Sequence, residues 1–339
     1  MVNLPLSPLF AAFPDFGREK GAYRGLLRFP YGFVMTDNMN PSPLPADETG
    51  FDRILTFSLP ARDARGRSVR LGPVLDTILA SHDYPPALKH LLAEALVLTA
   101  LMGGLLKDEG SQLTMQAQTE SGIVELLVCD YRDGELRGYV QHDPERFAGL
   151  GANPGLSSLF GEGYLAITFD LALGGERYQG IVPLEGDSLS EAVESYFAQS
   201  EQVPTLIRTA VKTGPDGCVA AGLLVQHLPE GEEGRERLHV RMDHPEWDHV
   251  AILAGSIRHE ELIDPALSQE AVIWRLFHEE SEVRVEQGRL LTRGCRCTIT
   301  HFEDVLARFP KEERREMSDE EGIIRVDCAF CSREFEIQD

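Results

Sequence analysis

The sequence predicts an α+β protein that has a layered N-terminal α/β-sandwich domain, a helical linker and a small C-terminal zinc-binding domain. Strand-like runs follow one another directly instead of alternating with helices, which favours a layered α+β domain over a doubly wound sheet. A charged, glycine-containing joint, PEGEEGRER, begins at residue 229, and four of the six cysteines lie after residue 294. A chain of 339 residues is too long for one small core. We therefore divide it into residues 1–48, 49–228, 229–294 and 295–339.

Residues 1–48 form a predicted N-terminal extension that is loosely ordered. They are rich in Pro, Phe, Asn and Gly and show no sustained period. Their start lacks the basic residues and the continuous apolar segment of a signal peptide, which predicts a cytoplasmic protein. Structural disulfides are rare in that compartment, so clustered cysteines there indicate metal binding or redox chemistry.

The core domain begins with an alternating pattern that predicts a strand over 52–59. The densest basic run of the chain, ARDARGRSVR (61–70), is predicted to be a solvated loop between two strands. Helical spacing after a starting proline predicts helices over 73–82 and 85–107. The second is apolar on most sides and is expected to be a central buried helix. Its longest apolar stretch, Ala95–Leu106, is too short to cross a membrane.

The rest of the core domain is predicted to be mostly strands. A helix is expected over 188–202, because Ser188 followed by Glu191 forms a capping-box pattern. The last two strands are expected to form an antiparallel pair around the turn GPDG. The strand-like segments are 112–119, 123–131, 136–143, 164–171, 177–184, 204–213 and 219–228.

The linker is predicted to contain two helices, from Pro245 to Leu262 and from Pro265 to Glu280. The segment is so highly charged that its helices need a partner to be stable, and we expect the folded C-terminal domain to support them. Loss of that support would expose an apolar surface suited to binding unfolded chains. The residues expected to contact such unfolded client chains are Trp247, Ile252, Ile257, Leu276 and Phe277.

The four clustered cysteines predict a tetrahedral zinc site. Cys295 and Cys297 form a CxC pair, and Cys328 and Cys331 form a CxxC pair. Each pair supplies two corners, and thiolates are ligands that zinc prefers. A domain as short as 295–339 rarely folds without metal, and structural zinc contributes roughly 10–16 kcal/mol. The small core expected beside it consists of Phe302, Val305, Leu306, Phe309, Ile323, Ile324, Val326, Phe330 and Phe335.

Three functions are compatible with this cysteine pattern. Arg293 and Arg296 favour thiolates, and a sulfenic acid on one cysteine could condense with its neighbour, which predicts a redox switch that releases zinc. A permanent zinc module, as in a static adaptor protein, is the first alternative. A thiol–disulfide oxidoreductase is the second, although Cys328 follows a strand near the chain end rather than opening a helix early in a βαβ unit. We expect no enzymatic activity.

The acidic composition argues against nucleic acid as a partner. The formal net charge of −23 repels phosphate backbones, and the sequence shows no local basic patch that would overcome it. We expect no membrane partner either.

Long stretches of the chain resemble the 33 kDa chaperonin family of redox-regulated heat-shock holdases. The similar stretches lie between Phe51 and Ile337 and include LASHDYPPALKHLLAEALVLTALMGGLLK, LTMQAQTESGIVELLVCDY, LRGYVQHD, GEGYLAITFD, ERYQGIVPLEGDSLSEAVESYFAQSEQVPT, AAGLLVQHLP, RLFHEESEVRV and the two cysteine pairs. The first 48 residues depart from the family pattern. So does TITHFED after the first pair, where the family has a serine and basic residues.

The resemblance implies a cycle that uses no ATP. In the reduced, zinc-bound form the family is inactive. Oxidation would link Cys295 to Cys297 and Cys328 to Cys331, after which zinc leaves and the linker unfolds. The oxidised protein, often a homodimer, would then hold unfolded client proteins.

Overall fold

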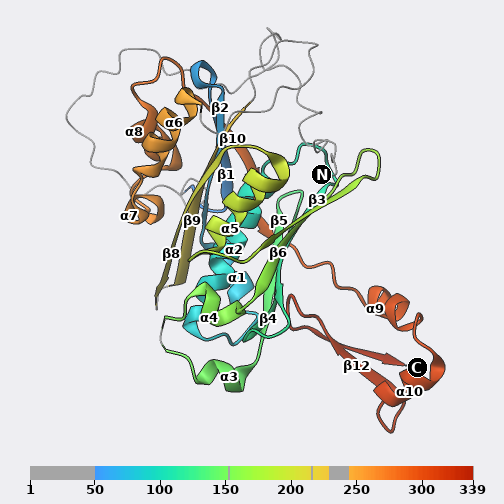
Figure 1. The fold of residues 1–339 in the computed structure, drawn as a ribbon. Helices are drawn as coiled ribbons and strands as arrows, with labels where there is room; N and C mark the ends of the chain where they lie inside the picture. The colour runs from blue at the N-terminus through green and yellow to red at the C-terminus, as the bar shows by residue number, and fades with distance from the viewer. Residues whose placement is uncertain (1–49, 152, 215–216, 229–243, 339) are drawn as a thin grey trace, which may run out of the picture.

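The computed structural model describes residues 50–151, 153–214, 217–228 and 244–338. It contains two large sheets, a group of helices on one side and a small C-terminal unit (Figure 1). The predicted α+β class is therefore confirmed. The predicted N-terminal extension (1–48) and the charged joint at 229–237 lie outside the described residues.

The first sheet has five strands in the order β10-β1-β2-β9-β8, and every neighbouring pair is antiparallel. The predicted strand at 52–59 and the predicted antiparallel pair at 204–213 and 219–228 are confirmed. The strand at the β10 end of the sheet was not predicted. The strands are β1 (Arg53–Leu59), β2 (Ala64–Leu71), β8 (Thr205–Gly214), β9 (Gly217–His227) and β10 (Arg284–Leu290).

The prediction that residues 61–70 form a solvated loop is wrong. A short 3-10 turn, η1 (Pro60–Arg62), leads into β2, which is almost entirely buried between β1 and β9. The arginines are accommodated because their guanidinium groups find partners inside the protein. Arg65 donates two hydrogen bonds to Oε1 of Gln226, and Arg67 donates to the carbonyl oxygen of Gly104.

The second sheet has six strands in the order β11-β5-β4-β3-β6-β7. Its strands are antiparallel except at β11, which runs parallel to β5. The five strands predicted between 112 and 184 are confirmed. The strands are β3 (Gln112–Thr119), β4 (Val124–Arg132), β5 (Glu135–His142), β6 (Gly163–Asp170), β7 (Arg177–Pro183) and β11 (Thr292–Arg293).

Helix α2 (Pro86–Gly103) lies between the two sheets and contacts strands of both. It is long and apolar enough to cross a membrane, but most of its side chains are buried in the protein core. The predicted central buried helix is confirmed. Helix α5 (Leu189–Tyr196) is capped by Ser188 as predicted, although Glu191 accepts from the backbone of Asp187. The remaining helical segments are α1 (Pro73–Leu79), α3 (Pro144–Ala148), α4 (Leu156–Phe160) and η2 (Phe197–Glu201).

Three helices cover the outer face of the five-stranded sheet, where two were predicted. These are α6 (Pro245–Gly255), α7 (His259–Ile263) and α8 (Gln269–Phe277), called here the linker helices. They pack against apolar side chains of β1, β2, β8 and β9, on the face opposite α2 (Figure 1). The expectation that the C-terminal domain supports them by direct packing is therefore wrong, because the sheet does so.

The C-terminal unit consists of α9 (Ile299–Leu306), α10 (Lys311–Met317), β12 (Ile323–Asp327) and β13 (Glu334–Gln338). Its small apolar cluster consists of Leu306, Ile324 and Ile337, with Phe302 and Val326 packed beside them, and Phe335 is also buried. Phe309 was expected in this core but is 39% exposed. Such a small core supports the expectation that the unit needs a metal to fold.

Candidate metal centre

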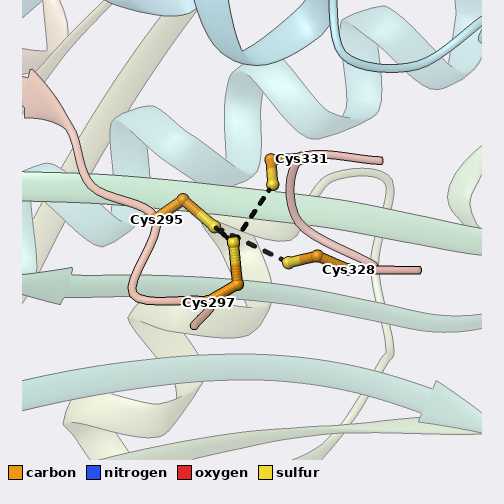
Figure 2. Close-up of side chains that lie close together, drawn as sticks. All are labelled: Cys295, Cys297, Cys328 and Cys331. Atoms are coloured by element: carbon orange, nitrogen blue, oxygen red, sulfur yellow. Dashed lines mark hydrogen bonds between the residues drawn. The ribbon is translucent and has the colours of Figure 1, made fainter. Parts of the chain in front are cut away.

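The four cysteine sulfurs converge on one point between β11 and the hairpin of the C-terminal unit. Figure 2 shows their side chains directed toward one another. The Sγ atoms of Cys295 and Cys297 are 3.2 Å apart, and those of Cys295 and Cys328 are 3.6 Å apart. Cys297 and Cys331 are separated by 3.5 Å, and all four sulfurs lie within 4.8 Å of one another. All four cysteines are free of disulfide bonds.

Backbone geometry at each cysteine pair explains this convergence. Cys295 follows β11, which is held parallel to β5, and Gly294 lies so close to β5 that an added Cβ would be 2.3 Å from the Cβ of Glu135. The second pair closes a tight turn in which the amides of Cys331 and Ser332 donate to the carbonyl oxygen of Cys328. Strands β12 and β13 enter and leave this turn as an antiparallel hairpin.

The electrostatics of the cluster favour a bound cation. Burial disfavours the thiolate at Cys295, but hydrogen bonds from the Cys297 amide and the other thiols lower its pKa to about 7. Burial and the neighbouring sulfurs raise the pKa values of Cys297 and Cys328. One thiolate is thus stabilised by the remaining thiols, whereas four thiolates at this spacing require a compensating positive charge.

The arrangement fits a tetrahedral zinc ion. With Zn–S bonds of about 2.3 Å, tetrahedral geometry places ligand sulfurs roughly 3.8 Å apart. The closest sulfur pairs here are 3.2 to 3.6 Å apart, and only small side-chain movements separate the two arrangements. Four sulfur ligands leave no position open for substrate, which is typical of a structural site.

The cysteine turn docks on the six-stranded sheet through Phe330, which lies between Cys328 and Cys331. Its ring makes an edge contact with the Tyr139 ring, with centroids 4.9 Å apart. The guanidinium carbon of Arg137 lies 4.0 Å from the centre of the Phe330 ring, in a cation–π contact. Phe330 was expected in the core of the C-terminal unit, and instead it attaches that unit to β5.

The first cysteine pair is attached to the same sheet by Arg296. Its Nη1 donates a 2.7 Å hydrogen bond to Oε1 of Gln112, and its Nε lies 3.5 Å from a carboxylate oxygen of Glu135. We predicted that Arg296 acts on the neighbouring thiolates. Its guanidinium group instead contacts the sheet, so its main role in this structure is to hold the loop.

The residues predicted to contact clients differ in their exposure. Phe277 is fully buried, Trp247 and Ile257 are nearly so, and Leu276 is partly buried on the sheet. Ile252 is 73% exposed on the outer side of α6. Ile252 therefore faces solvent already in this structure, because the buried stripe of α6 runs through Trp247, Val250 and Ala254.

An ionic cluster that we did not predict fastens the linker helices to the core. Arg62 donates from Nε to Oε2 of Glu280 at 2.8 Å and from Nη1 to Glu246 at the start of α6. The other oxygen of Glu280 lies 2.7 Å from Nε2 of His249. Burial raises the pKa of Glu280, but the bonds from Arg62 and His249 outweigh it and lower the value overall.

A buried arginine fastens the middle of the linker. Arg70 is 1% exposed and donates to the carbonyl oxygens of Leu262 and Leu267, at 2.8 and 2.7 Å. These carbonyls lie at the end of α7 and in the turn before α8. Burial lowers the pKa of Arg70. Alternation of Arg65 and Arg67 with small residues could have indicated a strand, but it did not indicate that Arg70 is buried.

The two cysteines outside the cluster lie in the core. Cys129 is on β4 and Cys218 on β9, and both are buried. Burial raises the pKa of Cys218 to about 11 and that of Cys129 further still. Buried thiols with raised pKa values carry little thiolate at neutral pH, so both positions are typical of inert core cysteines.

Comparisons with known proteins agree with this architecture. The sequence profile of the Hsp33 protein family matches residues 52–338. A 33 kDa chaperonin of Caulobacter vibrioides is 38% identical over 301 residues, which cover 86% of this chain and 97% of the relative. A 33 kDa chaperonin of Pseudomonas paraeruginosa is 35% identical over 289 residues, with 84% and 91% covered.

A solved structure supports the same fold. The crystal structure of a 33 kDa chaperonin from Thermotoga maritima superposes with a TM-score of 0.69, covering 85% of this chain and 95% of that one. The sequence identity between the two is 22%. Together with the profile match, these findings confirm the resemblance drawn from the sequence motifs. The chain belongs to the Hsp33 family, a family of chaperones.

Proposed function

We propose that this chaperone is an ATP-independent holdase whose activity is switched on by oxidation of the four clustered cysteines. One observation carries the proposal: a single short segment, β10 and β11, joins these cysteines to helices that cover an apolar sheet face. A chemical change at the sulfurs therefore has a direct covalent route to a surface that could bind unfolded chains.

Zinc is the proposed ligand of Cys295, Cys297, Cys328 and Cys331. The four-sulfur donor set, the spacing of the sulfurs and the small core of the C-terminal unit all support it. When bound, the ion compensates the four thiolates and holds both cysteine loops together. Those loops in turn hold Phe330 and Arg296 against the six-stranded sheet.

Oxidation is proposed to remove the metal by consuming its ligands. Each pair of zinc-bound thiolates would give two electrons to hydrogen peroxide, which takes two protons from solvent and leaves as two water molecules, and one S–S bond forms per pair. Family resemblance gives the pairing as Cys295–Cys297 and Cys328–Cys331. A disulfide sulfur is a poor zinc ligand, so the ion and its folding free energy are lost together.

Release of the linker helices is proposed to expose the client-binding surface. Trp247, Ile257, Leu276 and Phe277 would leave the sheet, and the apolar side chains beneath them would become accessible. Unfolded proteins expose similar apolar surface, so association would bury both. The sheet residues uncovered in this way are Leu55, Phe57, Leu59, Ala64, Ala210, Ala221, Leu223 and Val225. We propose further that the protein is cytoplasmic and non-enzymatic, that its active form is a homodimer, and that it binds neither nucleic acid nor membranes.

The test compares reduced and peroxide-treated protein in suppressing the aggregation of a heat-unfolding client. A chromogenic chelator measures zinc release, and mass spectrometry maps the disulfides. We expect suppression only after oxidation, with zinc release following thiol loss. Equal suppression by both forms would indicate a static zinc-stabilised adaptor, and turnover of a disulfide substrate would indicate an oxidoreductase. Retention of zinc after all four thiols have reacted would refute the switch.

A further inference from the structure

Strand β10 occupies an edge of the five-stranded sheet, where its only strand neighbour in the described chain is β1. The two strands pair antiparallel, from Arg53 opposite Leu290 to Ser58 opposite Arg284. On its other side, β1 pairs with β2 along its whole length. Departure of β10 would therefore leave one complete row of β1 backbone groups without partners, and such rows pair readily with extended chains.

The side chains of β10 contribute little to holding it in place. Val285 is its one buried side chain, whereas Glu286, Gln287, Arg289 and Leu290 are exposed. The strand is fixed mainly by backbone pairing and by its two ends. One end follows the linker helices, and the other continues into β11 beside Cys295. An edge strand with so few buried contacts belongs to the least stable part of a fold.

We propose, on the basis of the proposed function, that β10 occupies a client-binding edge of β1 in the reduced protein. After β10 leaves, an extended client segment pairs with β1 in its place. The recognised chemistry is an extended backbone that carries an apolar residue at the position of Val285. The antiparallel backbone pairing supplies affinity without reading the client sequence, which suits a chaperone of broad specificity.

The register of β10 shows where such a segment would place its side chains. Val285 stands opposite Phe57 and lies in the same apolar cluster as Leu55 and the linker helices. Every second side chain of a strand added to β1 would point to that face. The edge and the face uncovered by the linker helices therefore form one continuous surface, on which a client gains backbone and side-chain contacts together.

Gly288 provides a matched control for this pairing. An added Cβ at this position would lie 2.7 Å from the carbonyl oxygen of Ile54 on β1. Any side chain there obstructs close approach of the two backbones. Substitution of Gly288 in a β10 peptide should therefore prevent pairing while leaving the other side chains unchanged.

The experiment uses oxidised, zinc-free full-length protein and a fluorescent peptide that spans residues 282–291. We expect saturable binding that an unfolded client displaces, and binding at least ten-fold weaker for the Gly288→Val peptide. Two further peptides carry backbone N-methyl groups on alternate residues. Only the set whose amides face β1 should lose binding, by ten-fold or more, and the other set should stay within three-fold.

Equal effects of the two methylated sets, whether both peptides keep or both lose binding, would overturn the proposal, because binding would then not depend on the backbone edge that faces β1. Failure of an unfolded client to displace the peptide would also overturn it. Suppression of aggregation is measured on the same oxidised sample, so the holdase function can stand when edge pairing fails. Reduced zinc-bound protein serves as the reference and should not bind the peptide.

Discussion

Arg62 and Glu280 are 218 residues apart in the sequence, yet the Nε of one donates to the Oε2 of the other at 2.8 Å. The Glu280 side chain is only 4% exposed, while that of Arg62 is 31% exposed. A carboxylate so well covered needs its partners, whereas the arginine is partly solvated. This ion pair joins the turn before β2 to the end of α8 and so restrains the linker helices.

Glu280→Gln should weaken linker docking in the reduced protein by about 1 kcal/mol, because a neutral amide keeps the shape but loses the charge. The two tryptophans of the chain, Trp247 and Trp274, both lie in the linker helices, so selectively excited tryptophan fluorescence reports on this region alone. We expect the emission maximum of the Glu280→Gln variant to shift to the red at a lower denaturant concentration than that of the wild type. Glu282→Gln is the matched control, because the Glu282 side chain is 43% exposed, and its fluorescence transition should match that of the wild type.

Protonation of the Glu280 carboxylate at acid pH should release the linker helices. The pKa of Glu280 is lowered from an ordinary value of 4.5, so its stabilisation is complete above that pH and is lost as the pH falls through the folded value. Fluorescence of the reduced protein between pH 7 and pH 3 should show linker release at the acid end. Glu246 and Glu261 also have lowered pKa values. Glu280→Gln should therefore remove only part of the acid transition, and an unchanged transition would contradict our assignment.

Arg70→Met should loosen the linker more strongly than Glu280→Gln. The substitution leaves the buried carbonyl oxygen of Leu262 without its donor, at a cost of about 1–3 kcal/mol, and also removes the donor from the partly buried carbonyl of Leu267. We expect the reduced, zinc-bound variant to suppress client aggregation without oxidant. The rate of amide hydrogen exchange should be higher than in the wild type over residues 245–280, and it should stay slow in α2. Fast exchange in α2 would mean that the core itself had unfolded.

An arginine on the same sheet controls for loss of charge in the Arg70 experiment. Arg53 of β1 donates one exposed hydrogen bond, to Gln287 at 3.0 Å. Arg53→Met should leave the reduced protein inactive and its exchange pattern unchanged. Activation of both variants to the same extent would indicate a general charge effect.

Phe330→Ala should detach the cysteine turn from the six-stranded sheet while the metal ligands remain. The edge contact with Tyr139 and the cation–π contact with Arg137 together contribute about 1–3 kcal/mol. We expect full zinc content in the reduced variant but faster peroxide-driven zinc release. Phe309→Ala is the control, because that ring is 39% exposed in the same unit. Equal release rates in both variants would contradict a docking role for Phe330.

Removal of zinc by a chelator under reducing conditions should unfold residues 295–338 and leave the two-sheet core folded. The buried core of Leu306, Ile324 and Ile337 is too small to sustain the unit alone. Amide exchange should become fast there and in β10 and β11, with a smaller rise in the linker helices. Identical exchange over 245–280 in holo, apo and oxidised samples would refute coupling between the metal centre and the linker.

The sequence predicted the elements whose side-chain pattern is local. The apolar run of α2, the alternation in β3 to β7 and the cysteine spacing each carry their own signal, and all appear in the structure. Strand β2 was missed because a basic run is usually exposed to solvent. Its guanidinium groups are instead buried against Gln226 and the carbonyl oxygens of Gly104 and Leu262. Those partners are distant in sequence.

The support of the linker was mispredicted for the same reason. Charge density showed that α6 to α8 need a partner, but no local pattern said which one. The apolar outer face of the five-stranded sheet is formed by side chains from different strands, among them Phe57, Ala210 and Val225, and no single strand shows it. Strand β10 was overlooked because its single buried residue, Val285, gives no alternation.

Helix α2 fills the space between the two sheets, and no side chain of α6, α7 or α8 belongs to that interior. The packing of this interior therefore does not depend on side chains of the outer helices. Under the proposed switch, return of reductant and zinc would let α6, α7 and α8 repack on a sheet that is already folded. That repacking would need contacts within one chain and no nucleotide-driven machine.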